Sequence, residues 1–206
     1  MLYREAPAHY NCRAMGDITL YRMRWMQWYW QADNASVNGD VAIGDRCSIW
    51  FGATIRGDVA PIIIGQRTNI QDGAIIHCDS GVPQTIGEQV TAGHGAVLHG
   101  AHIGNRVLIG MKAVLLGRTV VEDDAIIAAG AVLSPGMHVP AGMVAIGVPA
   151  KIVRPVRPQE RIDNLANNDH YVELADAHVK DPGKYYRLPK RHGIPSPADV
   201  TDPMRA

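Results

Sequence analysis

Apolar residues recur every six positions over most of this chain. The longest unbroken series comprises Ile103, Ile109, Leu115, Val121, Ile127, Leu133, Val139 and Ala145. Shorter series precede it, namely Val37, Ile43, Ile49 and Ile55, then Ile64, Ile70 and Ile76, then Ile86, Ala92 and Leu98. An α-helix cannot keep a period of six on one face, and a simple strand alternates with a period of two. A short strand followed by a bend satisfies the pattern, which therefore predicts a parallel β-helix.

The other positions of each hexad support this interpretation. The fifth position holds small or modestly apolar residues: Cys47, Ala53, Thr68, Ala74, Val90, Ala96, Ala113, Thr119, Ala125 and Ala131. The fourth position often holds glycine or aspartate: Gly52, Gly73, Gly95, Gly130, Gly136, Gly142, Asp40, Asp58 and Asp124. These two residue types tolerate the positive φ of a sharp corner. The predicted fold class is an all-β solenoid that turns at these residues.

The repeat divides the chain into four parts. Residues 1–33 lie outside it and carry the aromatic and basic sequence YRMRWMQWYW. We expect this segment to cover the open first coil, with contact to a membrane surface or a partner as the alternative. The β-helix is predicted over residues 34–156, and a C-terminal α-helix over 157–180, starting near Pro158. The proline-rich tail, residues 181–206, is predicted to be poorly ordered.

The composition argues against a nucleic-acid-binding protein, a disulfide-rich protein and a membrane-spanning protein. Twenty basic and twenty acidic residues cancel, so no electrostatic footprint indicates nucleic acid. The three cysteines, Cys12, Cys47 and Cys78, lack the C-x-x-C spacing of metal sites, which favours reduced thiols. No segment has the length and apolarity of a membrane span, and the N-terminus lacks the apolar core of a signal peptide. We therefore expect a cytoplasmic protein without a membrane span.

Two histidines fall in one predicted column of side chains. Three hexads make one turn of a triangular coil, and strands in adjacent coils lie about 4.8 Å apart. By this count Arg56, His77 and His99 occupy the same outward position in successive coils. Asp72 and His94 stack near a corner, which turns them onto another side of the prism. His77 and His99 are therefore predicted to bind one metal from the same side.

The third ligand is expected from a neighbouring chain. His94 is five residues before His99, but the intervening corner separates them within one chain. A threefold homotrimer solves this problem because one subunit's corner meets the next subunit's face. Three neutral imidazoles plus water form a catalytic metal arrangement. The remaining histidines are interpreted as solvated or hydrogen-bonded surface residues: His9, His102, His138, His170, His178 and His192.

Four stretches carry a resemblance to a known family: GDVAIGDRCSIWFGATIRGDV, IGQRTNIQDGAIIHC, IGEQVTAGHGAVLHGAHIGNRVLIGM and GVPAKIVRPV. They resemble the gamma-class carbonic anhydrases and their short-loop bacterial homologues over about residues 34–156. The resemblance implies a left-handed β-helix and a homotrimer with zinc, or else ferrous iron or cobalt, at each subunit interface. It also implies hydration of carbon dioxide to bicarbonate.

The same resemblance assigns residue roles. It makes His77, His94 and His99 the metal ligands, in agreement with the column argument. Catalytic roles fall to three residues: Gln71, which matches a glutamine that hydrogen-bonds the attacking hydroxide, its active-site neighbour Asn69, and Tyr171, which resembles a tyrosine near the metal. Structural roles at the interface fall to three more: Arg56 and Asp72, which match a pair joining subunits, and Asp58 of the same Arg-Gly-Asp turn.

The chain departs from the best-studied members of that family in two places. Val59 stands where they have a glutamate after the Arg-x-Asp turn. The loop 78–85, CDSGVPQT, has Asp79 as its only acid and Ser80 where they have a glutamate that shuttles protons. Proton export is therefore expected to be slow, or to use another group such as Tyr171 or buffer.

Two other functions fit the repeat. Hexapeptide β-helices also serve as acyl-CoA-dependent acyltransferases, which use one histidine at the subunit interface as a general base and need no metal. The third hypothesis is a metal-binding scaffold trimer with weak or lost catalysis, which contacts a larger assembly through its tryptophan-rich N-terminus. Metal content distinguishes the hydratase from the acyltransferase.

Overall fold

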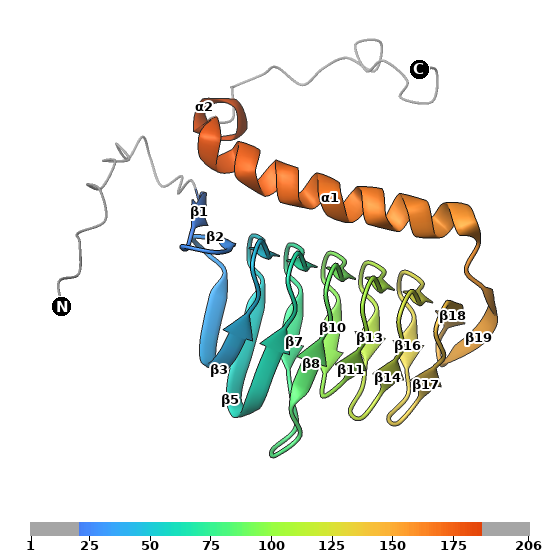
Figure 1. Cartoon of the computed structure of the whole chain (residues 1–206). Helices are drawn as coiled ribbons and strands as arrows, with labels where there is room; N and C mark the ends of the chain where they lie inside the picture. Colours follow the sequence, from blue (N-terminus) through green and yellow to red (C-terminus); the bar gives the residue numbers. More distant parts are fainter. Residues whose placement is uncertain (1–20, 187–206) are drawn as a thin grey trace, which may run out of the picture.

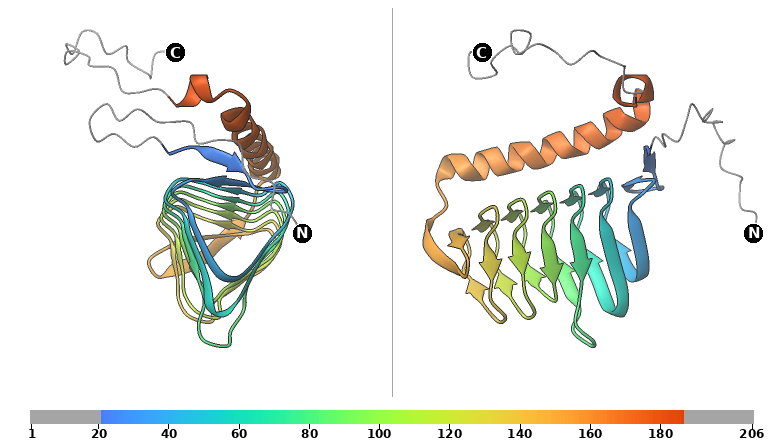
Figure 2. Two further views of the ribbon diagram at one scale, coloured as in Figure 1. Left: turned by 90° about the vertical axis from the view of Figure 1, so that its left-hand side faces the viewer. Right: turned by 180° about the vertical axis from the view of Figure 1, so that it is seen from behind.

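The computed structural model describes residues 21–186, so the first part of the predicted N-terminal segment and most of the predicted tail lie outside the described residues. Within this range the chain forms a triangular parallel β-solenoid with a long helix beside it (Figures 1 and 2). The view along the axis in Figure 2 shows three strand faces around one interior. A parallel β-solenoid followed by a C-terminal α-helix, the predicted fold class, is therefore confirmed.

Two sheets build the three faces. One face is a nine-stranded sheet: β1 (Met23–Trp25), β2 (Trp30–Ala32), β4 (Ser48–Ile49), β6 (Asn69–Ile70), β9 (Thr91–Ala92), β12 (Leu108–Ile109), β15 (Ile126–Ile127), β18 (Met143–Gly147) and β19 (Ala150–Pro155). We call it the helix-side face, because α1 packs against β4 and β6.

The second sheet forms the other two faces. The long strands β3 (Ser36–Ile43) and β5 (Thr54–Ile64) pair in parallel and run along both. The histidine face continues from β5 with β7 (Ile75–His77), β10 (Val97–His99), β13 (Val114–Leu115) and β16 (Val132–Leu133). The third face continues with β8 (Gln84–Ile86), β11 (His102–Ile103), β14 (Val120–Val121) and β17 (His138–Val139).

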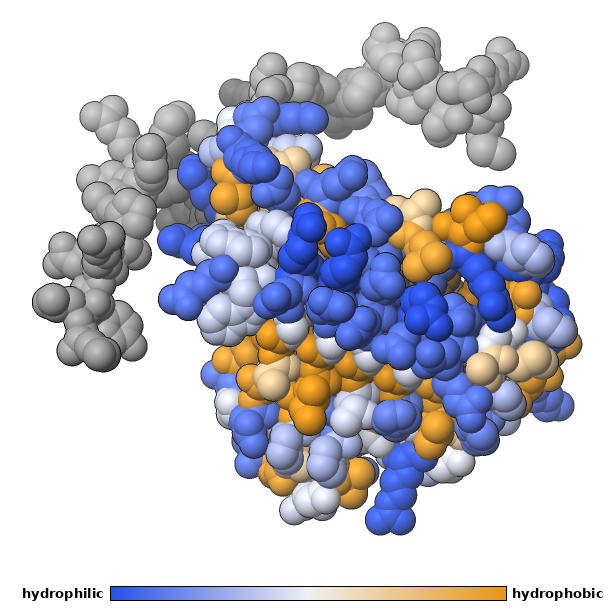
Figure 3. All heavy atoms as spheres, viewed as in Figure 1, coloured by the Kyte–Doolittle hydropathy of each residue, from blue (hydrophilic) through white to orange (hydrophobic). Residues whose placement is uncertain are grey.

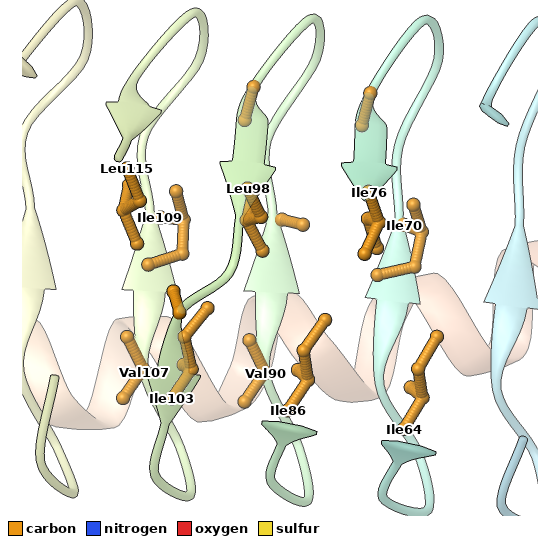
Figure 4. Packing of buried hydrophobic residues seen from close by; sticks show 14 of the residues in the cluster. Ile64, Ile70, Ile76, Ile86, Val90, Leu98, Ile103, Val107, Ile109 and Leu115 are labelled. Atoms are coloured by element: carbon orange, nitrogen blue, oxygen red, sulfur yellow. The ribbon is translucent and has the colours of Figure 1, made fainter. Parts of the chain in front are cut away.

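The six-residue series forms the core. Its members from Ile49 to Ala145 are 0–2% exposed and stack coil upon coil inside the prism (Figure 4). Each fully buried isoleucine or leucine contributes about 1.5–3 kcal/mol relative to an exposed one. Val37 and Ile43 are only half-buried, because they lie in the first coil. The hexad pattern therefore predicted the inward side chains correctly apart from this end.

The corners differ in part from the prediction. The six predicted glycines and Asp124 have positive φ, but Asp40 and Asp58 do not, because β3 and β5 run straight through those positions. Six other non-glycine residues take positive φ at the same hexad position: Arg46, Arg67, Gln89, Arg106, Lys112 and Arg118. Their backbone N–H groups bond to carbonyls elsewhere in the coil stack, as in Lys112 N–H to His94 O at 2.9 Å. This hydrogen bond stabilises a conformation that costs roughly 1–2 kcal/mol in isolation.

Helix α1 (Pro158–Lys180) begins at the predicted proline, and the short α2 (Pro182–Tyr185) follows it. Glu160 accepts hydrogen bonds from the backbone and side chain of Arg157, which caps the first turn. The spacing of Ile162, Leu165, Val172, Ala175 and Val179 predicts an apolar side of this helix, but Ile162 is exposed. Asn164 and Asn168 are instead buried towards the solenoid. Asn164 Nδ2 donates to Arg106 O at 2.8 Å, whereas Asn164 Oδ1 and both polar atoms of the Asn168 amide are buried without a hydrogen-bond partner among the described residues.

An antiparallel hairpin, β1–β2, extends the helix-side face beyond the first full coil. Strand β2 pairs in parallel with β4, and Met23 and Trp30 are buried in the core cluster. Trp25 and Trp28 remain partly exposed.

Neither helix described for residues 21–186 has the length and apolarity needed to cross a membrane. Burial raises the pKa of Cys47 to about 12, which fits a core thiol.

Candidate metal centre

Strands β7 and β10 bring two imidazoles together. Their parallel register places His77 opposite His99, while Ile76 and Leu98 point inward. His77 Nδ1 lies 3.3 Å from His99 Nε2, and the ring centroids are 5.2 Å apart. The column predicted from the repeat count therefore exists on the histidine face.

The spacing of these two nitrogens fits a shared metal. Two nitrogens at about 2.0–2.1 Å from a tetrahedral zinc ion lie about 3.3–3.4 Å from each other. The second nitrogen of each ring faces a carboxylate: His77 Nε2 is 3.0 Å from Asp58 Oδ1, and His99 Nδ1 is 3.7 Å from Asp79 Oδ1. A carboxylate behind a ligating histidine fixes the tautomer and orients the ring. Both rings therefore present one available nitrogen on the same side.

Asp58 supports this pair from β5. Although desolvation acts in the opposite direction, hydrogen bonds from His77 and Arg56 hold the pKa of the Asp58 carboxyl below its usual value. Its carboxylate is therefore charged at neutral pH and accepts a hydrogen bond from His77 Nε2. The Arg-Gly-Asp segment, expected to be a turn, lies within strand β5.

His94 has the same arrangement at a corner between the helix-side face and the histidine face. Its Nδ1 lies 2.9 Å from Asp72 Oδ2, and its backbone N–H donates to Gln71 Oε1 at 3.2 Å. Its Nε2 lies 3.3 Å from the hydroxyl of Tyr171. His94 therefore also has a carboxylate on one nitrogen and presents the other away from it.

One chain does not bring the three histidines together. Among residues 21–186, no group of three histidine, cysteine, aspartate or glutamate side chains is placed to hold a metal ion. His77 and His99 share one face, and His94 lies at the corner with Asp72. Within the described residues the chain thus carries a histidine pair on one face and a third histidine at a corner, which we call the two half-sites.

Gln71 and Asn69 lie beside the His94 half-site. Both flank the inward Ile70, a position that predicts outward side chains, yet Gln71 and Asn69 are only 4% and 1% exposed. Gln71 Nε2 donates to Asn69 Oδ1 at 3.1 Å, and Asn69 Nδ2 donates to Thr91 Oγ1 at 2.9 Å. Gln71 is thus fixed at both ends of its amide, with one N–H left to bind a further group.

Tyr171 is positioned by α1. Its ring stands edge-on to Trp50, with centroids 5.3 Å apart at 88°. An ion pair between Arg67 and Asp169 joins the same part of α1 to a solenoid corner. Burial, with a further contribution from Asp72, raises the pKa of the Tyr171 hydroxyl. Tyr171 therefore keeps its proton at neutral pH and acts as a hydrogen-bond donor.

The predicted interface pair is not formed within the chain. Arg56 binds Asp58 on the histidine face, whereas Asp72 binds His94 at the corner. Both Arg56 and Asp72 are accessible to another molecule. Arg56 therefore lies with the His77–His99 half-site, and Asp72 lies with the His94 half-site.

The sequence did not predict the cluster of aromatic side chains beside His94. His178, interpreted as a solvated or hydrogen-bonded surface residue, is half-buried and stands edge-on to Trp50, with centroids 5.4 Å apart at 86°. Its ring stacks on Tyr185, and its Nδ1 lies 3.0 Å from the hydroxyl of Tyr186. The available signal was its position seven residues after Tyr171, on the same side of a helix.

Comparison with known proteins places this chain among hexapeptide-repeat proteins. Residues 100–135 match the family model described as bacterial transferase hexapeptide (six repeats). A Bacillus cereus protein of known structure, provisionally named as an acetyltransferase, shares the fold with a TM-score of 0.71 and 36% identity, covering 74% of this chain and 88% of its own. The solenoid itself is therefore shared with proteins of that name.

Curated relatives narrow the family. A Geobacillus kaustophilus protein named carbonic anhydrase is 41% identical over 161 residues, which cover 76% of this chain and 81% of the relative. A Methanocaldococcus jannaschii protein named probable carbonic anhydrase is 41% identical over 145 residues, 70% of this chain and 91% of the relative. Gamma carbonic anhydrase 2 of Arabidopsis thaliana mitochondria is 40% identical over 75% of this chain, but only 58% of that relative's length is spanned. The chain belongs to the gamma carbonic anhydrase family.

Proposed function

We propose that this protein is a metal-dependent carbonic anhydrase, a homotrimer that hydrates carbon dioxide to bicarbonate. One observation carries the proposal: His77 Nδ1 and His99 Nε2 lie 3.3 Å apart on stacked strands, and each ring has a carboxylate behind it. His94 repeats this arrangement at a corner of the same chain. The proposed ligands are His77 and His99 of one subunit with His94 of the next.

One relative position of two subunits along the solenoid axis would bring the two half-sites together. On the histidine face, Arg56, His77, His99 and Leu116 occupy successive coils, and Asp72, His94 and Met111 follow one another along the corner. If His94 meets the neighbour's His77 and His99, Asp72 falls one coil away towards the neighbour's Arg56. Met111 then falls one coil in the other direction, towards the neighbour's Leu116. This one relative position of the subunits therefore forms the predicted Arg56–Asp72 ion pair, the metal site and an apolar contact between Met111 and Leu116.

Exposed apolar side chains support an interface at these surfaces. Met111 is 58% exposed, and Ile75 is exposed on the histidine face beside His77. Figure 3 shows apolar side chains gathered over the strands below α1, in the view of Figure 1. A monomer seldom exposes such a continuous apolar patch, whereas a subunit interface buries it.

In the proposed reaction the metal would supply the nucleophile, and the side chains of the protein would supply hydrogen-bond donors. A bound divalent metal supplies a hydroxide nucleophile at neutral pH, because coordination lowers the pKa of water to about 7. The free N–H of Gln71 is placed to hydrogen-bond an oxygen beside His94, and Asn69 holds the other N–H of the same amide. The Tyr171 hydroxyl lies 3.3 Å from His94 Nε2, so metal binding at that nitrogen would leave the hydroxyl to donate to an oxygen at the site. These fixed donors stabilise negative charge as it develops on the bicarbonate oxygens.

An acyltransferase is the second candidate, because the Bacillus cereus protein of similar fold carries that name. An acyltransferase of this fold needs one histidine as a base, whereas this chain sets three imidazoles against carboxylates. The scaffold hypothesis shares the metal and the trimer but expects little turnover. Zinc as the native metal, with ferrous iron or cobalt as alternatives, and a cytoplasmic location stay predictions.

Stopped-flow hydration of carbon dioxide by anaerobically purified, metal-quantified protein tests the proposal. We expect about one zinc or iron per chain, and a hydration rate that disappears after chelation and returns with the metal. Metal-free protein that transfers an acyl group from acyl-CoA would favour the acyltransferase. Full metal content without hydration would favour the scaffold.

A further inference from the structure

We infer that His178 is the proton acceptor that serves this site, an inference that rests on the proposed hydration of carbon dioxide. Each conversion of carbon dioxide and water to bicarbonate releases one proton, which must leave before the next cycle. The loop 78–85 offers Asp79 as its only acid, and that carboxylate faces His99. An imidazole is the side chain whose ordinary pKa suits proton exchange near neutral pH.

The structure connects His178 to the His94 half-site through Trp50 and Tyr171. It follows Tyr171 by two turns of α1, a rise of about 10 Å. Trp50 contacts both rings edge-on, Tyr171 at 5.3 Å and His178 at 5.4 Å between centroids. Tyr171 in turn reaches His94 Nε2 at 3.3 Å. Tyr171 and Trp50 therefore form a continuous set of contacts between His94 and the half-buried imidazole of His178.

The surroundings of His178 favour a neutral ring that can accept a proton. Burial lowers the pKa of His178, and the Asp72 carboxylate opposes part of that effect. The rings packed against it are uncharged: Trp50 and Phe51 from the turn after β4, and Tyr185 and Tyr186 from the C-terminal segment. Two cations lie over these tyrosines, Lys184 at 5.1 Å from the Tyr185 ring and Arg22 at 5.7 Å from the Tyr186 ring, and they also favour a neutral imidazole. At pH 7 the ring is therefore mostly neutral, and Asp72 stabilises the cation once it forms.

Two tyrosines orient the ring. Tyr185 stacks on it at 4.1 Å and 22°, and Tyr186 lies 3.0 Å from Nδ1. The Tyr186 oxygen already accepts the Met23 N–H at 2.6 Å and has a second lone pair for a proton on Nδ1. This tautomer leaves Nε2 free. A water O–H bond at the site breaks, the proton passes through Tyr171 and bridging water, and an N–H bond forms at Nε2; buffer then removes that proton.

The test compares metal-loaded trimers of wild type, His178→Gln and the control His138→Gln. His138 lies on the third face, paired with Glu122, away from both half-sites. In dilute, non-imidazole buffer we expect kcat for hydration to fall about tenfold or more in His178→Gln, with kcat/KM and metal content unchanged. Adding imidazole should restore kcat to near the wild-type value.

A second measurement separates proton export from carbon dioxide conversion. Exchange of ¹⁸O between carbon dioxide and water at chemical equilibrium reports interconversion with bicarbonate separately from release of labelled water, which needs a proton. We expect only the second rate to fall in His178→Gln. Equal kcat in His178→Gln and His138→Gln, or a loss in kcat/KM that imidazole does not rescue, overturns the inference. Absence of hydration in the wild type would instead overturn the proposed function.

Discussion

At the scale of single residues, the positions of the carboxylates define the site as much as the histidines do. Asp58, Asp79 and Asp72 each face one nitrogen of a different imidazole, at 3.0, 3.7 and 2.9 Å. His138 also faces a carboxylate, with its Nε2 2.7 Å from Glu122 Oε1, so a carboxylate by itself does not mark a metal ligand. We propose that the second nitrogens of His77, His99 and His94 bind the shared ion.

Replacing His94 with alanine tests the ligand set. Because three-nitrogen coordination becomes two-nitrogen coordination, His94→Ala should lose most of its metal and at least about 100-fold in hydration. Elemental analysis after gel filtration gives the metal content, and His138→Ala controls for loss of a surface histidine. Full metal content in His94→Ala would exclude it as a ligand.

At the scale of elements, coil stacking constrains the glycines more strongly than backbone conformation does. A Cβ at Gly110 would overlap the backbone of Ala128 and Ala129 in the next coil. Gly130 has φ +68°, yet a Cβ there would meet nothing within 4 Å. The close approach of the corners, rather than positive φ, therefore dictates glycine at position 110.

These two glycines give a matched pair of variants. Gly130→Ala should lower the free energy of unfolding by about 1–2 kcal/mol, the cost of a left-handed alanine. Gly110→Ala should cost more, about 3 kcal/mol or above, because two backbones must separate. Urea unfolding followed by circular dichroism measures both. Equal losses would show that the coils adjust easily.

At the scale of the whole molecule, the proposed trimer brings the histidine face of one chain against the next chain's corner that holds His94. Trimers of His94→Ala keep the histidine-face half, and trimers of His77→Ala keep the corner half. Each alone should be inactive. When the two are unfolded together and refolded as mixed trimers, about a quarter of the sites should be intact, because each mixed ring has one complete interface. If mixing restores no activity, the ligands do not come from two chains.

Met111 tests the subunit register independently of metal. Met111→Glu places a charge in the proposed apolar contact, so we expect monomers by light scattering and little metal, with the solenoid's circular dichroism unchanged. Ile162→Glu is the control, since Ile162 is equally exposed, at 58%, on the outer side of α1. A trimeric Met111→Glu protein would contradict the register.

The sequence by itself determined the solenoid, its inward residues and the pairing of His77 with His99. A six-residue period fixes both the direction of each side chain and its partner one coil away, so counting hexads was sufficient. The period carries no information about where a later helix packs. Only the tertiary structure decided that Gln71 and Asn69 are buried and that Ile162 is exposed. It also brought His178 to Trp50, because these contacts join segments more than a hundred residues apart, and their geometry depends on how α1 lies along the finished coil.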